Sequence, residues 1–514
     1  MTTSKTDRPE TGARGGGRLR SSAAAIGGTA IGAAANFAAL AVVAAFYDEV
    51  TFGTLSAVTA IFQLTSVSVR LGTDVAATYF IGRETNDQRV PQARRILTIT
   101  VIPVALVTTA LSTIVILQSD QLASWLAKPA EQAEYAQMLE IIAIALPLSA
   151  VGEVLLSATR GFGSMLSTVI GVNVGRQCGQ LVLIVAAAIF AAEESDVLAA
   201  AWAAPFLATL LVPAGWLMVK GILSAKPATQ PQPAGAVWAY AVPQAAGAAV
   251  QGGLEKADIM MLNTMVGAEE AGQYNLANRF VHLFVLVRYA LGTAHAAALA
   301  QDIRTKNFTA VHLRHSQVTA WSLVLCGPGL VILAAFPEAV LGLVGEEYTA
   351  GATSLQILTL GLLGSLLLGH SLAVVSLSGA AVRVFVYNAG SLLMNVAANV
   401  VLIREYGAAG AAWAWAAATI VPRAAAHRYI RHRYDIRIFT EPVVVAAIAT
   451  AVVAVLAVAG RLLLGDEPLG VFVTIPIAVL VWAGMVATWR QRLALQRDPD
   501  VDERLTYDYA RSDR

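Results

Sequence analysis

Long apolar runs, bounded by charged residues, glycine or proline, recur along the whole chain and constrain its fold more than any other feature. Many of them reach the ~20 residues that a helix needs to span a lipid bilayer. Only 13% of the 514 residues are charged, whereas soluble proteins carry about 25% charged residues. The mean hydropathy of +0.63 agrees. We therefore predict an all-α integral membrane protein, because helices satisfy their own backbone groups in lipid.

The spacing of the apolar runs predicts fourteen transmembrane helices. Their expected limits are 21–47, 53–82, 93–117, 137–160, 165–191, 196–222, 236–266, 272–303, 311–336, 351–378, 381–402, 408–432, 440–464 and 469–492. The first span is longer than the apolar region of a cleaved signal peptide, so we interpret it as an uncleaved helix. Cys178 and Cys326 have no metal-site or disulfide spacing and are interpreted as small buried side chains.

The distribution of Lys and Arg orients these helices. With a cytoplasmic N-terminus, 27 of the 35 basic residues fall in inner loops and tails, whereas Lys128, Arg404 and Arg461 fall outside. The outer loops are acidic, as in "EESD" and "GEEY". Both termini are therefore predicted to be cytoplasmic. The basic stretch "HRYIRHRY" is interpreted as an inner loop on anionic headgroups, with no nucleic-acid role.

Charged residues within the predicted spans are candidates for function. Five are basic, namely Arg70, Arg176, Lys256, Arg279 and Arg288. Four are acidic, namely Asp74, Glu153, Glu255 and Asp258. A charge at a helix centre costs at least ~2.5–3.5 kcal/mol, so such side chains usually face a bundle interior or a wet cavity.

An internal repeat relates the two halves of the chain. The stretch "FGTLSAVTAIFQLTSVSVRLGTDVAATYF" from Phe52 runs beside "AGQYNLANRFVHLFVLVRYALGTAHAAAL" from Ala271. This predicts two six-helix lobes in parallel topology with a substrate site between them, followed by two additional helices. The predicted domains are a basic cytoplasmic tail (1–20), a first lobe (21–222), a cytoplasmic linker (223–235), a second lobe (236–437), two additional helices (438–492) and a cytoplasmic tail (493–514).

Three segments of the second half carry recognisable motifs. They are "EKADIMMLNTMVGAEEAGQYNLANRF", "FPEAVLGLVGEEYTAGATSLQIL" and "MNVAANVVLIREYGAAGAAWA". Because these three motifs occur in this order, the chain resembles the polysaccharide (Wzx-type) flippases of the multidrug/oligosaccharidyl-lipid/polysaccharide (MOP) exporter superfamily. One departure is "IREYG", where many relatives have a proline before the tyrosine.

The resemblance implies a fourteen-helix, multi-pass transporter of the cell membrane that works by alternating access. It would flip polyprenyl-(pyro)phosphate-linked oligosaccharide from the inner to the outer leaflet for cell-surface polysaccharide biosynthesis. Membrane lipids, a polysaccharide polymerase and glycosyltransferases are the other implied partners. No cofactor is expected, and H⁺ or Na⁺ are the candidate coupling ions. No G-x-x-x-x-G-K-[ST] segment occurs, so the chain is not an ATP-driven pump by itself.

Moving a pyrophosphate and a sugar chain through lipid calls for cationic and hydroxyl-bearing groups. The candidate substrate-binding residues are Arg70, Arg176, Lys256, Tyr274, Asn275 and Arg279. Tyr274 is expected to stack on a sugar ring. Glu255 and Asp258 are the candidates for ion coupling. Neither catalytic residues nor a metal site are predicted.

Helical geometry and charge pairing limit this set. Asn275, Arg279 and His282 share one face of a helix, whereas Arg288 lies about 180° from Arg279. Structural interpretations also remain open. Arg70 and Asp74 are four residues apart and can neutralise each other, and Lys256 can form ion pairs with its acidic neighbours. Arg176 has no acidic neighbour in the sequence, which favours a role with substrate.

Two other functions compete with the flippase. A cation-coupled multidrug antiporter would share the fold, but such antiporters usually carry an acidic residue in the first helix, where this chain has Asn36. Five basic residues within spans also suit an anionic lipid better than a cationic drug. A membrane glycosyltransferase could use Asp48 and Glu49, but no outer segment exceeds roughly 20 residues, which leaves little room for acceptor-holding loops. We therefore expect that this chain is not an enzyme. The glycan and the coupling ion stay open.

Overall fold

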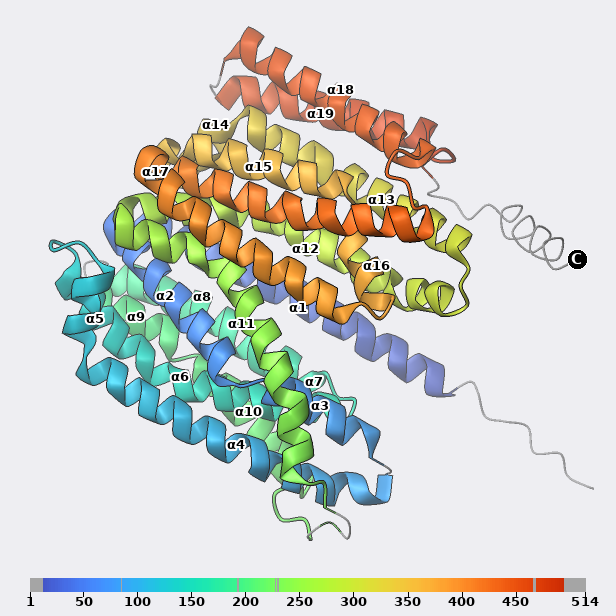
Figure 1. Ribbon diagram of the computed structural model, residues 1–514. Helices are drawn as coiled ribbons and strands as arrows, with labels where there is room; N and C mark the ends of the chain where they lie inside the picture. The colour runs from blue at the N-terminus through green and yellow to red at the C-terminus, as the bar shows by residue number, and fades with distance from the viewer. Residues whose placement is uncertain are drawn as a thin grey trace, which may run out of the picture. The chain divides into compact units, whose positions relative to one another are not determined.

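The computed structural model describes residues 13–84, 86–191, 194–226, 228, 231–465 and 468–493. All regular elements in these ranges are helices (Figure 1). Within them, ten stretches are long and apolar enough to cross a membrane, and Ile31–Phe46 is a shorter apolar helix. The predicted all-α, multi-pass membrane class is confirmed. Most of the predicted tails, 1–20 and 493–514, lies outside the described residues.

The chain forms two compact units, Met1–Gly252 and Gly253–Arg514. The predicted lobe and linker limits, the count of fourteen helices and the side on which the termini lie remain predictions. Unit 1 contains α1 (Ala13–Phe46), α2 (Glu49–Val69), α3 (Thr73–Arg83), α4 (Asn86–Leu117), α5 (Ser119–Leu126), α6 (Gln132–Gly161), α7 (Leu166–Thr168), the π-helix η1 (Val169–Cys178), α8 (Gly179–Phe190), α9 (Ser195–Ala203), α10 (Phe206–Val219) and the start of α11 (Ala234–Met265).

Helix α6 is the centre of unit 1, because α2, α3, α4, α9 and α10 all pack against it. The buried core at one side of α6 includes Phe80, Ile96, Leu155, Leu217 and Ala241. These residues come from five helices that are apolar on nearly all faces, as expected for helices that meet both lipid and protein. The core holds α3, α6 and the start of α11 in fixed positions around the polar residues described below.

The structure divides the predicted span 53–82 into α2 and α3. Leu71 and Gly72 have φ values of 53° and 70°, in the left-handed region that ends a helix. A Cβ on Gly72 would lie 2.1 Å from the carbonyl oxygen of Ala241 in α11. Glycine is therefore required here both by the backbone conformation and by the close approach of α11.

Unit 2 begins within α11 and continues through a second helical bundle. Its helices are α12 (Ala268–Arg304), α13 (Phe308–Ala335), α14 (Pro337–Gly342), the 3₁₀-helix η2 (Glu346–Gly351), α15 (Ala352–Leu367), α16 (Ser371–Leu377), α17 (Ala381–Tyr434), α18 (Glu441–Leu464) and α19 (Pro468–Thr488). Helix α13 packs against α12, α15 and α18, and α19 lies beside α18 (Figure 1). Val331, Phe336, Val453, Ala457 and Ala478 form the buried core that joins α13, α18 and α19.

Helix α17 bends at Gly407, between the predicted spans 381–402 and 408–432. Gly407 has φ 55° and ψ −132°, so the helical path is interrupted there. The carboxylate of Glu270 accepts a 2.8 Å hydrogen bond from the Ala408 backbone amide. A Cβ on Gly407 would lie 2.3 Å from the same carboxylate. The two predicted spans are thus two segments of one helix, joined at a kink that Glu270 supports.

Candidate functional site

Unit 1 contains a cavity of about 210 Å³ that brings two of the predicted site residues together. Its polar lining residues are Asn36, Gln63, Ser66, Arg70, Ser149, Glu153, Arg176, Gln177 and Gln180. Its apolar lining residues are Phe62, Val67, Trp202 and Phe206. The charged groups at its wall are thus two arginines and one glutamate. Such a lining can take an anion together with groups that form hydrogen bonds.

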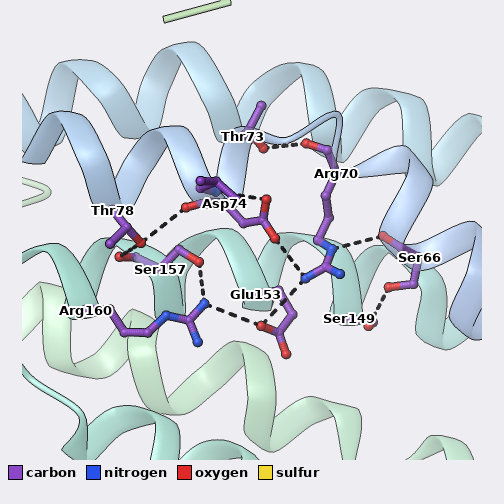
Figure 2. Close-up of polar contacts among 10 residues, drawn as sticks. Ser66, Arg70, Thr73, Asp74, Thr78, Ser149, Glu153, Ser157 and Arg160 are labelled. Atoms are coloured by element: carbon purple, nitrogen blue, oxygen red, sulfur yellow. Dashed lines mark hydrogen bonds and ion pairs between the residues drawn. The ribbon is translucent and has the colours of Figure 1, made fainter. Parts of the chain in front are cut away.

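Arg70 enters this cavity from the end of α2 and is held by acidic side chains. Its Nη1 lies 3.1 Å from Asp74 Oδ2 and 3.8 Å from Glu153 Oε2 (Figure 2). Arg160 Nη2 approaches the same Glu153 oxygen at 3.8 Å. The side chains of Arg70, Asp74 and Glu153 are only 15%, 19% and 21% exposed. The Arg70–Asp74 pairing considered from the sequence is present, and Arg70 belongs to a four-residue ionic network.

Hydrogen bonds to serine hydroxyl and carbonyl groups fix this network onto its helices. Arg70 Nε donates to the Ser66 carbonyl oxygen at 3.2 Å, and the hydroxyls of Ser66 and Ser149 share a 2.9 Å hydrogen bond (Figure 2). Arg160 Nη2 donates to Ser157 Oγ at 2.5 Å. These bonds join α2 to α6, so the arginine at the cavity wall has little freedom to move.

Arg176 is the other arginine of the cavity, and its surroundings differ. Its guanidinium carbon lies 5.0 Å from the centre of the Phe206 ring, a cation–π distance. Its Nε is buried and has no hydrogen-bond partner within the part of the chain that the structure describes. An arginine carries five N–H donors. Arg176 therefore keeps unused donors in a cavity where Arg70 is already paired.

The π-helix η1 positions Arg176. π-Helices are rare and are often found at functional sites. On one side, η1 packs closely against α1, since a Cβ on Gly32 would lie 1.9 Å from Gln177 Oε1 and 3.1 Å from Asn173 Cα. On the other side, a Cβ on Gly175 would lie 2.7 Å from Ala208 Cβ in α10. Small residues thus let α1 and α10 hold the turn that carries Arg176.

In unit 2, Asp258 is 2% exposed and is held by three hydrogen bonds. Tyr274 donates its hydroxyl to Oδ2 at 3.0 Å, while Asn395 and Asn399 donate side-chain amides to Oδ1 at 2.9 and 2.7 Å. Asn399 Nδ2 also lies 3.2 Å from Asn395 Oδ1. The buried Asn399 Oδ1 has no hydrogen-bond partner among the described residues. The group therefore joins α11, α12 and α17 around one carboxylate.

This arrangement changes how the predicted residues of unit 2 are interpreted. Tyr274 is 0% exposed, and its hydroxyl donates a hydrogen bond to Asp258. This favours a structural role for Tyr274 over stacking on a sugar ring. Asn275 is also buried, at 3% exposure. Glu255 is exposed. Within the described residues, Asp258 forms no ion pair with Lys256 and takes its hydrogen bonds from Tyr274, Asn395 and Asn399.

A cationic group lies on α11 and α12 of unit 2, defined here as Lys256, Arg279 and His282. The charges of these three half-buried side chains act on one another, with Glu255 as the acidic group near Lys256. Arg279 has no ion pair in the described ranges of the chain. As the helical geometry predicted, Arg279 and His282 occupy the same region, because they are three residues apart on one helix.

Several residues of these sites were missed from the sequence. Asn395 and Asn399 stand in the quoted motif "MNVAANVV" at the i, i+4 spacing of one helix face, so the signal was present. From the sequence, Arg423 belongs to the stretch "RAAAHRYIRHRYDIR", whose basic residues are assigned to the inner loops. The structure instead places its half-buried side chain in α17, where Nη1 donates to the Thr419 carbonyl oxygen at 2.5 Å.

Comparison with known proteins assigns the family. The MatE family model matches residues 25–176 and 243–401, one segment in each predicted half of the repeat. No curated protein matches the sequence.

Three solved structures share this fold at low sequence identity. The lipid II flippase MurJ in an inward closed conformation is 12% identical, with a TM-score of 0.73, 90% of this chain and 98% of that chain covered. An inward-facing multidrug resistance MATE family transporter is 15% identical, with a TM-score of 0.65 and coverage of 78% and 94%. A MOP superfamily transporter from Pyrococcus furiosus is 15% identical, with a TM-score of 0.58 and coverage of 81% and 95%.

The match to the family model covers more than half of the chain, and the neighbours share its fold. This chain therefore belongs to the MatE family, and it is a multi-pass cell-membrane transporter of the MOP superfamily, not an enzyme.

Proposed function

We propose that this transporter flips polyprenyl-(pyro)phosphate-linked oligosaccharide from the inner to the outer leaflet of the cell membrane. The observation that carries the proposal is the environment of Arg176: its buried Nε has no hydrogen-bond partner among the described residues, and it lines a cavity whose other arginine is already paired. A guanidinium matches the geometry of phosphate oxygens and binds them through paired hydrogen bonds. A buried donor without a partner costs free energy, and a hydrogen bond from Arg176 Nε to a phosphate oxygen would offset that cost.

The remaining lining of the unit 1 cavity suits a sugar. Gln63, Gln177, Gln180 and Asn36 offer amide groups, which both donate and accept hydrogen bonds. Trp202 adds an aromatic ring at the cavity wall. Aromatic faces and amides together match the mixed apolar and hydroxyl surfaces of a sugar ring.

The cationic group of unit 2 supports the same substrate class. Lys256 and Arg279 bring positive charge to the region that His282 shares, and Arg279 has no carboxylate partner in the described residues. The MurJ structure is that of a lipid II flippase by its title, and it aligns over 90% of this chain. Glycosyltransferases that build the oligosaccharide and a polymerase that receives it are the protein partners that this function implies.

Asp258 is our candidate for coupling transport to a cation. Its carboxylate, Asn395 Oδ1 and Asn399 Oδ1, which has no hydrogen-bond partner among the described residues, are oxygen atoms of one buried group of side chains. Oxygen atoms are the ligands that hard cations prefer. A bound Na⁺ or H⁺ would change the bonds that join α11, α12 and α17, which is how a site couples to a conformational equilibrium. Glu255, the other candidate, is exposed.

A cation-coupled multidrug antiporter is the second candidate. Glu153 favours it, because this carboxylate and the rings of Phe62, Trp202 and Phe206 line one cavity and could take an apolar cation. Against it, Glu153 lies within 3.8 Å of both Arg70 and Arg160. The first helix also contributes Asn36 to the cavity where an antiporter would carry an acid.

The test is the leaflet distribution of lipid-linked glycans in cells depleted of this protein. We expect build-up on the inner leaflet, relieved by the wild type and by Arg404→Gln, an exposed arginine of α17 that serves as the matched control. Arg176→Gln and Arg279→Gln should fail to relieve it. Absence of build-up, together with altered resistance to cationic dyes, would assign the chain to the antiporters instead.

A further inference from the structure

A second cationic group in unit 2, separate from Lys256, Arg279 and His282, consists of Arg288, His370 and Arg423. Arg288 lies on α12, His370 immediately precedes α16, and Arg423 lies on α17. His370 Nε2 is 3.1 Å from the Arg288 carbonyl oxygen. Arg423 lies close enough for its charge to act on both Arg288 and His370. His370 thus contacts Arg288 directly, and a third element brings Arg423 within electrostatic range of the pair.

The close approach of His370 depends on Gly292 in α12. A Cβ on Gly292 would lie 2.8 Å from His370 Cδ2, closer than a side chain tolerates. The carbonyl oxygen of Arg288 accepts a hydrogen bond from Nε2, so this bond fixes the proton on Nε2 and leaves Nδ1 to face the group. The imidazole is therefore held in one orientation beside the two arginines.

This group has polar nitrogen atoms without partners among the described residues. Arg288 Nε and His370 Nδ1 are both buried and have no hydrogen-bond partner among the described residues. Arg423 uses one N–H on the Thr419 carbonyl oxygen. No carboxylate within the described ranges forms an ion pair with Arg288 or Arg423. Like charges held close together away from bulk water without a counter-ion are unfavourable.

The group is distinct from the one that contains Arg279. Arg288 follows Arg279 by nine residues on α12, which corresponds to about 13.5 Å along the axis and the opposite face of the helix. One phosphate cannot touch both arginines. By the predicted orientation, α12 runs inward, so Arg288 lies on the cytoplasmic side of Arg279.

We infer that Arg288, His370 and Arg423 form an anion site that binds the phosphate or pyrophosphate group of a ligand. When an anion binds, His370 can take a proton on Nδ1 and donate a hydrogen bond alongside Arg288 Nε. Resting on the proposed function, this site is the first to receive the pyrophosphate of a lipid-linked oligosaccharide from the inner leaflet. The binding chemistry itself does not depend on that function.

The test uses the purified full-length chain in detergent. Thermal midpoints are measured against inorganic pyrophosphate, a polyprenyl pyrophosphate and phosphatidylglycerol, which separates a free anion, the lipid carrier and a bulk phospholipid. The variants are Arg288→Gln and Arg423→Gln, with Arg404→Gln as the exposed arginine control and Arg279→Gln for the other cationic group. Hydrogen exchange over residues 285–295 and 366–376 gives a local readout.

We expect pyrophosphate and the polyprenyl pyrophosphate to raise the midpoint and to slow exchange in both segments, with a smaller effect of phosphatidylglycerol. Arg288→Gln should raise the midpoint in anion-free buffer, because it removes an uncompensated charge, and should abolish the local slowing. Arg279→Gln should keep the slowing. If either Arg288→Gln or Arg423→Gln does not fold, the other variant tests the anion site.

Two results would overturn the site. One is full anion-dependent slowing in both Arg288→Gln and Arg423→Gln. The other is a lower midpoint of these variants without anion, as expected if the arginines had structural partners. Failure of the proposed function looks different, because the chain would then bind pyrophosphate at these segments and yet move no lipid-linked glycan.

Discussion

The side-chain amide of Asn399 donates a 2.7 Å hydrogen bond to Asp258 Oδ1, although 141 positions separate the two residues in the sequence. With Asn395 and Tyr274, it encloses a carboxylate that is 2% exposed. A buried carboxylate with three donors is a strong constraint on the helices that supply them.

Asp258→Asn should lower the free energy of unfolding by about 2 kcal/mol, because the new amide faces amide donors and leaves some without an acceptor. The same change should remove the dependence of transport on a Na⁺ or H⁺ gradient. Unfolding is measured by thermal denaturation in detergent, and coupling by transport with and without each gradient. The control is Glu255→Gln, which should change the unfolding midpoint little because Glu255 is exposed. Unchanged gradient dependence in both variants would exclude this pair from coupling.

Arg176→Gln should reduce transport by about tenfold or more, the effect of losing one charged hydrogen bond of about 1.5 kcal/mol to the substrate. Its unfolding midpoint should stay level or rise, because Arg176 Nε has no hydrogen-bond partner in the part of the chain that the structure describes. Parallel measurement of transport and midpoint checks both parts. A midpoint that falls together with transport would mean that Arg176 is a structural residue.

Arg70→Gln should behave in the opposite way, because it leaves the carboxylates of Asp74 and Glu153 without their shared partner. Breaking a largely buried ion pair from one side costs about 3 kcal/mol, so the midpoint should fall clearly. Adding Asp74→Asn to this variant should restore part of the loss, since Asp74 then has no ion-pair partner among the described residues, whereas Glu153 keeps Arg160. Additive losses in the double variant would show that the two side chains do not interact.

Gly32→Ala should destabilise unit 1 and reduce transport, because its Cβ would lie 3.0 Å from Asn173 Cβ and 3.1 Å from Asn173 Cα and would press α1 against the backbone of the π-helix that carries Arg176. Overpacking of this kind costs about 1–3 kcal/mol. The matched control is Gly215→Ala in α10, where a Cβ would meet nothing within 4 Å. The control should be neutral or slightly stabilising, as alanine favours helix more than glycine does. Equal effects of the two substitutions would show that the α1 contact does not position η1.

The local sequence was enough to predict the helices but not every break within them. The apolar runs predicted α6, α11, α13 and α18 because length and hydrophobicity alone decide whether a segment spans a membrane. The tripeptide Leu-Gly-Thr at 71–73 ends a helix, whereas the same tripeptide at 291–293 continues one. Gly72 meets the Ala241 carbonyl oxygen, and Gly292 meets the ring of His370. The tertiary neighbour, not the local sequence, decides between the two.

The site residues divide in the same way. The Arg70–Asp74 pair was predictable because residues at i and i+4 are neighbours on any helix. The partners of Asp258 were not, because Asn395 and Asn399 lie 137 and 141 positions away and no periodicity links them. The interaction between the charges of Arg423 and Arg288 could not be predicted either, because the two residues are far apart in the sequence.

The central claim is that the chain moves an anionic lipid-linked sugar rather than a cationic drug. It is tested most directly with the purified protein in liposomes, by measuring how fast a fluorescent polyprenyl-pyrophosphate oligosaccharide becomes accessible in the opposite leaflet. The claim predicts fast exchange with the wild type and with Arg404→Gln, slow exchange with Arg176→Gln and Arg279→Gln, and no uptake of a cationic dye. Gradient-driven dye transport without movement of the labelled lipid would contradict it.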